Sequence, residues 1–189
     1  MITLVLGGAR SGKSALAERL AAALPAPITY VATLLTGDRP DEDLLARIAV
    51  HQSRRPAEWG TVEAGLDLPD RLRASAGTIL LDSLGPWVAL HTTQPASTST
   101  STSTSTSTST SITPTVDGEA LCRALVERTG DAVVVSEEVG FGVHPSTEAG
   151  RTFRDNLGRL NQQVSAVADR VLLVVAGRVL PLEPLEQWT

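Results

Sequence analysis

The sequence predicts an α/β fold, in which helices flank a central, mainly parallel β-sheet. Short apolar runs of strand length alternate along the chain with amphipathic helical segments, and this alternation is typical of parallel sheets. The first apolar run leads through a glycine-rich segment at residues 7–14 into a helical pattern. The chain has 189 residues, which is the size of one domain.

The first elements follow from apolar runs and helix signals. Residues 2–6 form an apolar run of strand length, and leucines recur every four residues across 14–24, which predicts a helix. Pro25 ends this helix, because proline cannot continue the backbone hydrogen-bonding pattern. A strand is expected at 28–32. A helix is expected at 41–55, where acidic residues in the first turn favour the helix dipole.

The middle of the chain predicts two strands and two helices. A short strand is expected at 61–63 and a short helix at 68–74. Residues 78–82 form a buried-strand pattern that is apolar until its last residue, Asp82. A further helix is expected at 84–90.

The C-terminal part continues the alternation. Helices are expected at 117–128 and 148–169, separated by a strongly β-branched strand at 132–136. Strands are expected at 171–175 and, over a shorter run, at 179–182.

The long helix at 148–169 carries a narrow apolar stripe. Its members repeat at alternating steps of four and three residues: Phe153, Leu157, Leu160, Val164 and Val167. Such a stripe is typical of a helix that packs on a sheet, and also of one that packs on another subunit. The sequence leaves both interpretations open.

Residues 97–111 form a tract of fifteen residues in which serine and threonine strictly alternate. The tract has no apolar side chain to bury, and water satisfies its hydroxyl groups. We therefore expect a single domain over residues 1–189 that carries this tract as a flexible surface insertion between two helices.

The composition excludes several classes of protein. No run approaches the roughly eighteen apolar residues of a membrane span, and a single cysteine excludes a disulfide framework. The first residues lack the basic segment and cleavage site of a secretory signal. The net charge of −5 argues against general nucleic-acid binding. We therefore expect a cytoplasmic protein without a membrane span or a nucleic-acid partner.

A phosphate-binding motif lies between the first strand and the first helix. The pattern G-x-x-x-x-G-K-[ST] is matched by Gly7-Gly8-Ala9-Arg10-Ser11-Gly12-Lys13-Ser14. Its glycines let backbone N–H groups turn toward phosphate oxygens, and the helix N-terminus adds partial positive charge. Lys13, the only lysine among 16 lysine and arginine residues, is expected to reach the β- and γ-phosphates. The motif therefore predicts binding of a nucleoside triphosphate.

The same motif predicts a Mg²⁺ ion. The Ser14 hydroxyl is expected to ligate the ion, which also needs a carboxylate contact. Asp82 ends a buried strand, as the acidic residue of a Walker B motif does. We therefore expect Ser14 and Asp82 to hold Mg²⁺.

A histidine and three arginines share one face of the helix predicted at 41–55. Arg47, His51, Arg54 and Arg55 lie at i, i+4, i+7 and i+8. Arginines bind polyphosphate oxygens and keep a neighbouring imidazole neutral, and a neutral imidazole can attack an α-phosphate and expel pyrophosphate. A solvated basic face with an incidental histidine is the alternative, and the residues alone leave both open.

Several motifs together resemble one known family. They occur in order across nearly the whole chain, apart from the serine–threonine tract: the motif at 7–14, Tyr30-Val31-Ala32-Thr33, Arg47-Ile48-x-x-His51-x-x-x-Arg55-Pro56-x-x-Trp59 with Glu63 after it, Leu80-Leu81-Asp82-Ser83, Glu138-Val139-Gly140-x-Gly142, and Phe153-Arg154-Asp155 through Gly158-x-x-Asn161. The chain thereby resembles the bifunctional adenosylcobinamide kinase/adenosylcobinamide-phosphate guanylyltransferase family of cobalamin biosynthesis.

This resemblance implies a RecA-like P-loop fold with Mg²⁺ as cofactor and ATP and GTP as substrates. It implies a homotrimer that binds adenosylcobinamide and its phosphate near subunit boundaries. It also implies that His51 carries GMP as a covalent intermediate, with Lys13 as a second catalytic residue. The implied nucleotide contacts are Gly7, Gly8, Ala9, Arg10, Ser11, Gly12, Lys13, Ser14, Ala32, Thr33, Leu34, Gln52, Ser53, Arg54, Arg55, Glu63 and Asp82.

One departure from the family pattern lies in the motif at 137–140. Many members have Asn-Glu-Val-Gly where this chain has Glu137-Glu138-Val139-Gly140, so an amide is replaced by a charge.

Two other functions are compatible with the phosphate-binding motif. A small-molecule P-loop kinase without guanylyl transfer accounts for the motif and Asp82, but it leaves the histidine face unexplained. A nucleotide-dependent regulatory switch predicts slow hydrolysis and no small-molecule acceptor.

Overall fold

The computed structural model describes residues 1–34, 45, 55–93 and 116–185. The serine–threonine tract lies outside these ranges, as does the helix predicted at 41–55 apart from residues 45 and 55. The predicted extent of a single domain over 1–189 therefore stays a prediction.

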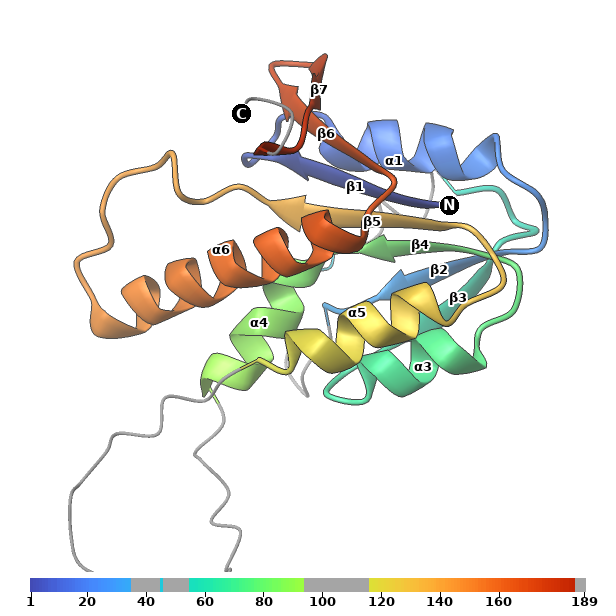
Figure 1. Ribbon diagram of the computed structural model, residues 1–189, viewed down its shortest axis with the longest axis horizontal. Helices are drawn as coiled ribbons and strands as arrows, with labels where there is room; N and C mark the ends of the chain where they lie inside the picture. The colour runs from blue at the N-terminus through green and yellow to red at the C-terminus, as the bar shows by residue number, and fades with distance from the viewer. Residues whose placement is uncertain (35–44, 46–54, 94–115, 186–189) are drawn as a thin grey trace, which may run out of the picture.

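The centre of the protein is a seven-stranded sheet with the order β3-β2-β4-β5-β1-β6-β7 (Figure 1). Its strands are β1 (Ile2–Gly7), β2 (Ile28–Ala32), β3 (Gly60–Glu63), β4 (Thr78–Asp82), β5 (Ala132–Glu137), β6 (Arg170–Val175) and β7 (Arg178–Leu182). All neighbouring pairs are parallel except β6 and β7, which are antiparallel. The predicted mainly parallel sheet is confirmed.

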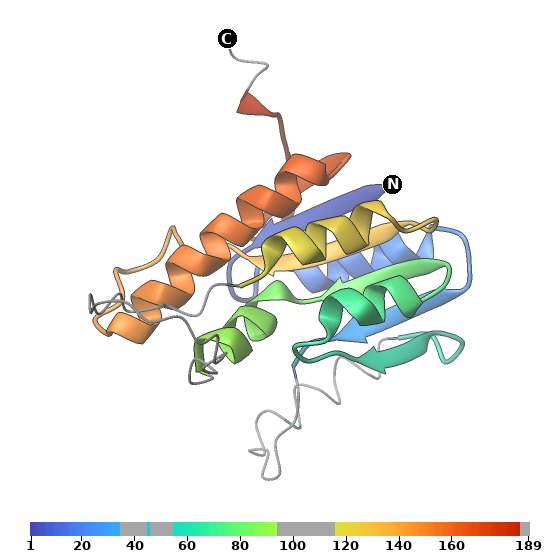
Figure 2. The ribbon, with the colours of Figure 1, turned by 60° about the horizontal axis from the view of Figure 1, so that its bottom comes forward.

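Helices cover both faces of this sheet. Helix α1 (Lys13–Ala22) packs on one face, while the other face carries α3 (Leu68–Ala74), α4 (Leu84–Thr93), α5 (Gly118–Val126) and α6 (Glu148–Val167). Figures 1 and 2 show α1 on the far side of the strands from these four helices. Parallel strands covered in this way are apolar on both faces, and Val133, Val134 and Val135 of β5 are fully buried.

The apolar stripe of α6 packs into the core beneath the sheet. Leu157, Leu160 and Val164 are buried in one cluster with residues of the strands, and Phe153 packs against that cluster. Full burial of one such leucine stabilises the fold by about 1.5–3 kcal/mol. Of the two interpretations of the stripe, packing on the sheet is confirmed.

Capping residues set where two of the helices begin. The Asp117 side chain accepts a hydrogen bond from Ala120 N–H at the start of α5 (2.9 Å). The Thr147 hydroxyl does the same for Gly150 N–H at the start of α6 (3.2 Å). Both side chains pair a backbone donor that the helix itself leaves without a partner.

The last strand reverses direction through a two-residue turn. Ala176 and Gly177 both have positive φ, of 49° and 73°, which matches the right-handed twist of a tight hairpin. The sequence predicted a strand at 179–182 but not its antiparallel direction. This hairpin forms one edge of the sheet, next to β1.

The strand registers bring the functional motifs to one edge of the sheet. Ala32 at the end of β2 pairs with both Glu63 and Asp82, and Gly7 at the end of β1 pairs with Glu137. Parallel strands present their carboxyl ends at a common edge, where α/β proteins bind ligands.

Candidate nucleotide-binding and catalytic site

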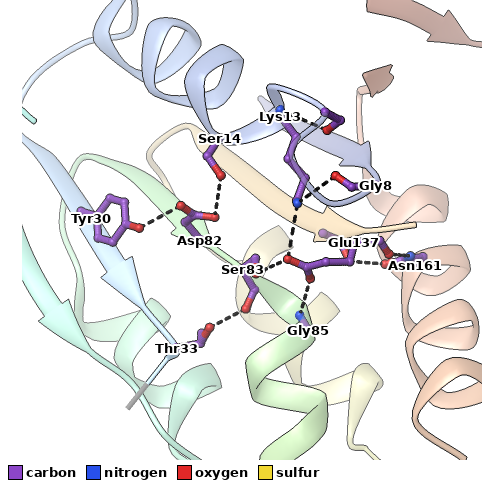
Figure 3. Close-up of polar contacts among 12 residues, drawn as sticks. Gly8, Lys13, Ser14, Tyr30, Thr33, Asp82, Ser83, Gly85, Glu137 and Asn161 are labelled. Carbon is purple, nitrogen blue, oxygen red and sulfur yellow. Dashed lines mark hydrogen bonds and ion pairs between the residues drawn. The ribbon is translucent and has the colours of Figure 1, made fainter. Parts of the chain in front are cut away.

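The phosphate-binding motif forms the loop between β1 and α1 (Figure 3). Gly12 precedes the helix with a φ of 98°, a left-handed conformation that favours glycine. The Lys13 side chain lies along the loop, with Nζ 3.4 Å from the Gly8 carbonyl oxygen. Its own backbone N–H donates to Ser11 Oγ at 3.3 Å. The loop thus combines a lysine with a helix N-terminus, the two features that bind phosphate.

Ser14 and Asp82, the two residues expected to hold Mg²⁺, face one another across the site. The Ser14 hydroxyl lies 3.4 Å from Asp82 Oδ1. Two oxygens can share one Mg²⁺ when they lie less than about 4 Å apart, because each Mg–O bond is about 2.1 Å long. These hard oxygen donors therefore fit the predicted ion. In the described part of the chain, no group of three or more His, Cys, Asp or Glu side chains is arranged to hold a metal ion.

The ends of β2 and β3 add further predicted nucleotide contacts to this edge. Thr33, directly after β2, is fully buried, and its hydroxyl donates to the Ser83 carbonyl. The next residue, Leu34, is exposed. Glu63 is also exposed, and the register places it at the same edge of the sheet as Asp82, with Ala32 of β2 between them.

Tyr30 is a site residue to which the sequence assigned no role. Its hydroxyl donates to Asp82 Oδ2 at 2.9 Å, while the Arg55 guanidinium lies over its ring, 3.2 Å from the centroid. Burial and the Asp82 carboxylate raise the pKa of Tyr30 well above its usual value, so the phenol stays protonated and donates. Tyr30 thus connects the predicted metal ligand to the arginine.

Glu137 is the second residue whose role sequence reasoning missed. It ends β5, and its Oε1 lies 3.7 Å from Lys13 Nζ. Oε1 also accepts from the Ser83 hydroxyl at 2.7 Å, and Oε2 accepts from Gly85 N–H at 3.0 Å (Figure 3). A carboxylate therefore stands beside the lysine of the phosphate loop. The added charge in the motif at 137–140 was the only sequence signal for it.

Asn161 on α6 fixes the end of β5. Its side-chain amide donates to the Glu137 carbonyl at 3.1 Å, and its amide oxygen accepts from the Ser136 hydroxyl at 2.6 Å. Both Asn161 and Ser136 are buried. These bonds tie the backbone that carries the Glu137 side chain to the long helix.

The predicted nucleophile belongs to the segment between β2 and β3. His51, Gln52, Ser53 and Arg54 lie outside the described residues, so their roles stay predictions. Arg55 is described, and its guanidinium stacks on Tyr30.

The two other histidines make contacts away from the phosphate loop. His91 packs edge-on against Trp87, and burial lowers its pKa. The His144 ring nitrogen Nδ1 lies 2.8 Å from a guanidinium nitrogen of Arg154. Neither arrangement suggests a nucleophile for nucleotide chemistry.

Two surface hollows lie elsewhere on the protein. One is lined by Ala124 and by residues 73–76 and 127–130, which precede β4 and β5 and so lie at the opposite edge of the sheet. The other is lined by Gly140 and residues of α6.

Among the described residues, no helix has the length and apolar character needed to cross a membrane.

A loop of this sequence between the first strand and helix, opposite an acidic strand end, defines a P-loop nucleotide-binding protein. The family model for cobinamide kinase/cobinamide phosphate guanyltransferase matches residues 3–182 of the chain. The chain belongs to this enzyme family, and the resemblance seen in its sequence motifs is confirmed.

Curated relatives agree with this family over nearly their whole length. The chain is 39% identical to the bifunctional adenosylcobalamin biosynthesis protein CobP of Pseudomonas aeruginosa, covering 98% of the chain and 100% of the relative. It is 35% identical to the bifunctional adenosylcobalamin biosynthesis protein CobU of Salmonella typhimurium, covering 94% and 97% respectively.

A solved structure supports the fold independently. An ATPase from the type III secretion system of pathogenic bacteria superposes with a TM-score of 0.51 at 12% identity. The match covers 91% of this chain but 50% of the ATPase chain, so the protein spans half the length of that neighbour. The predicted P-loop fold is confirmed.

Proposed function

We propose that the protein carries out two successive reactions on a cobinamide substrate. In the first, the hydroxyl of the aminopropanol arm of adenosylcobinamide takes the γ-phosphate of ATP or GTP. In the second, GMP passes from GTP to adenosylcobinamide phosphate and gives adenosylcobinamide-GDP. The observation that carries this proposal is the convergence of Lys13, Ser14 and Asp82 at the phosphate loop of a chain from this family.

The phosphoryl transfer needs positioning and charge stabilisation more than a protein nucleophile. The acceptor oxygen bonds to the γ-phosphorus and releases its proton to water. The bond from the γ-phosphorus to the oxygen that bridges to the β-phosphate breaks, and the nucleoside diphosphate leaves. Lys13 and the N–H groups of the loop stabilise the charge that develops on the phosphate oxygens. Ser14 and Asp82 would hold Mg²⁺, which neutralises charge on the β- and γ-phosphates when bound.

The guanylyl transfer needs a nucleophile, and we assign that role to His51. Its imidazole nitrogen bonds to the α-phosphorus of GTP, and the bond to the leaving pyrophosphate breaks. The phosphate oxygen of the acceptor then displaces the imidazole and takes the GMP group. Arg54 and Arg55 stabilise the leaving pyrophosphate. The Tyr30 ring stacks against the Arg55 guanidinium and holds it in position.

The remaining proposals follow from the family. The nucleotide contacts comprise residues 7–14, Ala32, Thr33, Leu34, the segment 52–55, Glu63 and Asp82. The protein works in the cytoplasm as a homotrimer that binds the corrinoid near its subunit boundaries.

A product assay tests the proposal directly. The protein is incubated with adenosylcobinamide, GTP and Mg²⁺, and the corrinoids are separated and weighed by mass spectrometry. We expect adenosylcobinamide phosphate first and adenosylcobinamide-GDP later. Formation of adenosylcobinamide phosphate without adenosylcobinamide-GDP would indicate a kinase that lacks guanylyl transfer. Slow GTP hydrolysis without either product would favour a regulatory switch.

A further inference from the structure

Glu137 places a fixed negative charge beside the lysine of the phosphate loop. Its Oε1 accepts from the Ser83 hydroxyl and lies 3.7 Å from Lys13 Nζ, and its Oε2 accepts from Gly85 N–H. The Glu137 side chain is 26% exposed and that of Lys13 12%, so water screens their interaction only in part.

The surrounding chain is shaped to hold this carboxylate. Gly85 lies in the first turn of α4, where backbone N–H groups and the helix dipole stabilise an anion. A Cβ atom at Gly85 would lie 2.3 Å from Glu137 Oε2, so only glycine permits this approach. Asn161 fixes the backbone of Glu137 from the opposite side. The charge therefore cannot easily swing away when a phosphate chain enters.

Among the described residues, the carboxylates of Asp82 and Glu137 thus lie at the phosphate loop with the Lys13 ammonium, and the Arg55 guanidinium lies farther out, on Tyr30. Asp82 is balanced by a metal ion when Ser14 and Asp82 hold one, whereas Glu137 has Lys13 as its charged partner. The same lysine must bind the β- and γ-phosphates. A metal-free nucleoside triphosphate carries about four negative charges and its magnesium complex about two, so repulsion by Glu137 falls more heavily on the metal-free form.

We propose that Glu137 makes this site select the magnesium complex of the nucleoside triphosphate over the metal-free nucleotide. This inference rests on the proposed magnesium role of Ser14 and Asp82. A neutral side chain at position 137 could not exert this repulsion. The charge in the motif at 137–140 is then a specificity determinant of this chain.

Nucleotide binding, measured without turnover, tests the proposal. The probe is the α,β-methylene analogue of GTP, whose bridge to the α-phosphate resists cleavage, and titration calorimetry gives its dissociation constant in Mg²⁺ and in EDTA. The wild type should bind much more tightly in Mg²⁺. The selectivity is the dissociation constant in EDTA divided by that in Mg²⁺. Glu137→Gln should lower this ratio by about ten-fold, which is about 1.4 kcal/mol, chiefly through tighter binding in EDTA.

Three further variants sharpen the test. Glu137→Asn should lower the ratio as Glu137→Gln does, whereas Glu137→Asp keeps the charge and should retain most of the selectivity. Glu119→Gln removes an equal charge from the exposed surface of α5 and should leave the ratio unchanged. Thermal melts verify that each variant is folded.

The outcomes separate this inference from the proposal beneath it. A wild type that binds equally well with and without Mg²⁺ overturns both the selectivity and the magnesium role. A wild type that prefers Mg²⁺, with the same ratio in folded Glu137→Gln and Glu137→Asn, overturns the role of Glu137 alone.

Discussion

Tyr30 orients the carboxylate of Asp82 from the neighbouring strand. Its hydroxyl donates to Oδ2 at 2.9 Å, which leaves Oδ1 facing the Ser14 hydroxyl at 3.4 Å. The register explains this contact, because Tyr30 pairs with Leu80 and so lies two residues before the position opposite Asp82, on the same face of the sheet. Asp82 Oδ1 is thereby left available to bind the proposed Mg²⁺ ion together with Ser14.

Replacing Tyr30 by phenylalanine should weaken the response to Mg²⁺. Tyr30→Phe removes the donor to Asp82 but keeps the ring beneath Arg55. We expect the Mg²⁺ concentration for half-maximal kinase activity to rise several-fold, with a loss of about 1 kcal/mol in unfolding free energy. Magnesium titrations of the kinase rate and urea unfolding measure the two effects. An unchanged Mg²⁺ requirement would show that Tyr30 does not position Asp82.

Tyr30 should also make stability fall at alkaline pH. Its pKa is raised in the folded protein from an ordinary value of 10.0, first by burial and then by Asp82. Above about pH 10 the unfolded chain loses the phenol proton while the folded protein keeps it, so unfolding becomes easier as pH rises. The stability difference between wild type and Tyr30→Phe should shrink by about 1 kcal/mol near pH 11. A constant difference would contradict this prediction. Tyr30 is the only tyrosine, so the ionisation of its phenol on unfolding at alkaline pH is also visible in the ultraviolet spectrum.

Lys13→Ala should abolish both reactions, because one phosphate loop serves both. Lys13 is the only lysine of the chain and begins α1, where its side chain crosses the loop. Without Lys13, Glu137 loses its charged partner but keeps its hydrogen bonds from Ser83 and Gly85. The melting temperature should therefore change little, while product formation is lost. Separate assays of the two corrinoid products measure this. A near wild-type rate for either reaction would show that the reactions use different phosphate sites.

His51→Ala should separate the two activities. Guanylyl transfer through a covalent intermediate needs the imidazole, whereas phosphoryl transfer to a hydroxyl does not. We expect the variant to lose the GMP adduct and adenosylcobinamide-GDP, and to keep kinase activity at a reduced level. Mass spectrometry after incubation with GTP detects the adduct, which should be labile in acid and stable in base. His144→Ala, on an exposed loop, is the matched control and should keep the adduct. An undiminished adduct in His51→Ala would contradict the assignment and favour the alternative, in which His51 is an incidental residue of a solvated basic helix face.

Deleting residues 97–111 should change stability little. The tract offers only serine and threonine, and loop closure costs about 0.6 kcal/mol for each doubling of loop length. Thermal melts and both product assays on the deletion should resemble those of the wild type. A large fall in melting temperature would mean that the tract packs on the protein, and lost activity would mean that it touches substrate.

The alternation of apolar runs and helical patterns was sufficient to predict the order of the described elements. Strand ends agree within one residue, because proline, glycine and acidic residues mark them in the sequence. The places of the phosphate loop between β1 and α1 and of Asp82 at the end of β4 were equally predictable, since both are local motifs, while their roles stay predictions. These features depend on residues close together in the chain.

The contacts of Tyr30 and Glu137 could not be predicted, because they depend on strand order. Glu137 meets Lys13 only because β5 pairs with β1, and Tyr30 meets Asp82 only because β2 pairs with β4. No local pattern gives these neighbours. The antiparallel direction of β7 was missed for a related reason, since periodicity gives the presence of a strand and not its direction.

The position of β1 between β5 and β6 determines when the phosphate loop can form during synthesis. The loop is translated among the first residues, but both neighbours of β1 come from the last third of the chain. In the finished fold, Gly177 N–H donates to the Ser11 carbonyl at 2.9 Å and braces the loop from the C-terminal hairpin. A nascent chain that still lacks this hairpin therefore has the motif without its support. The hydrogen-bonded support of the phosphate loop is therefore complete only once residue 177 has been added to the chain.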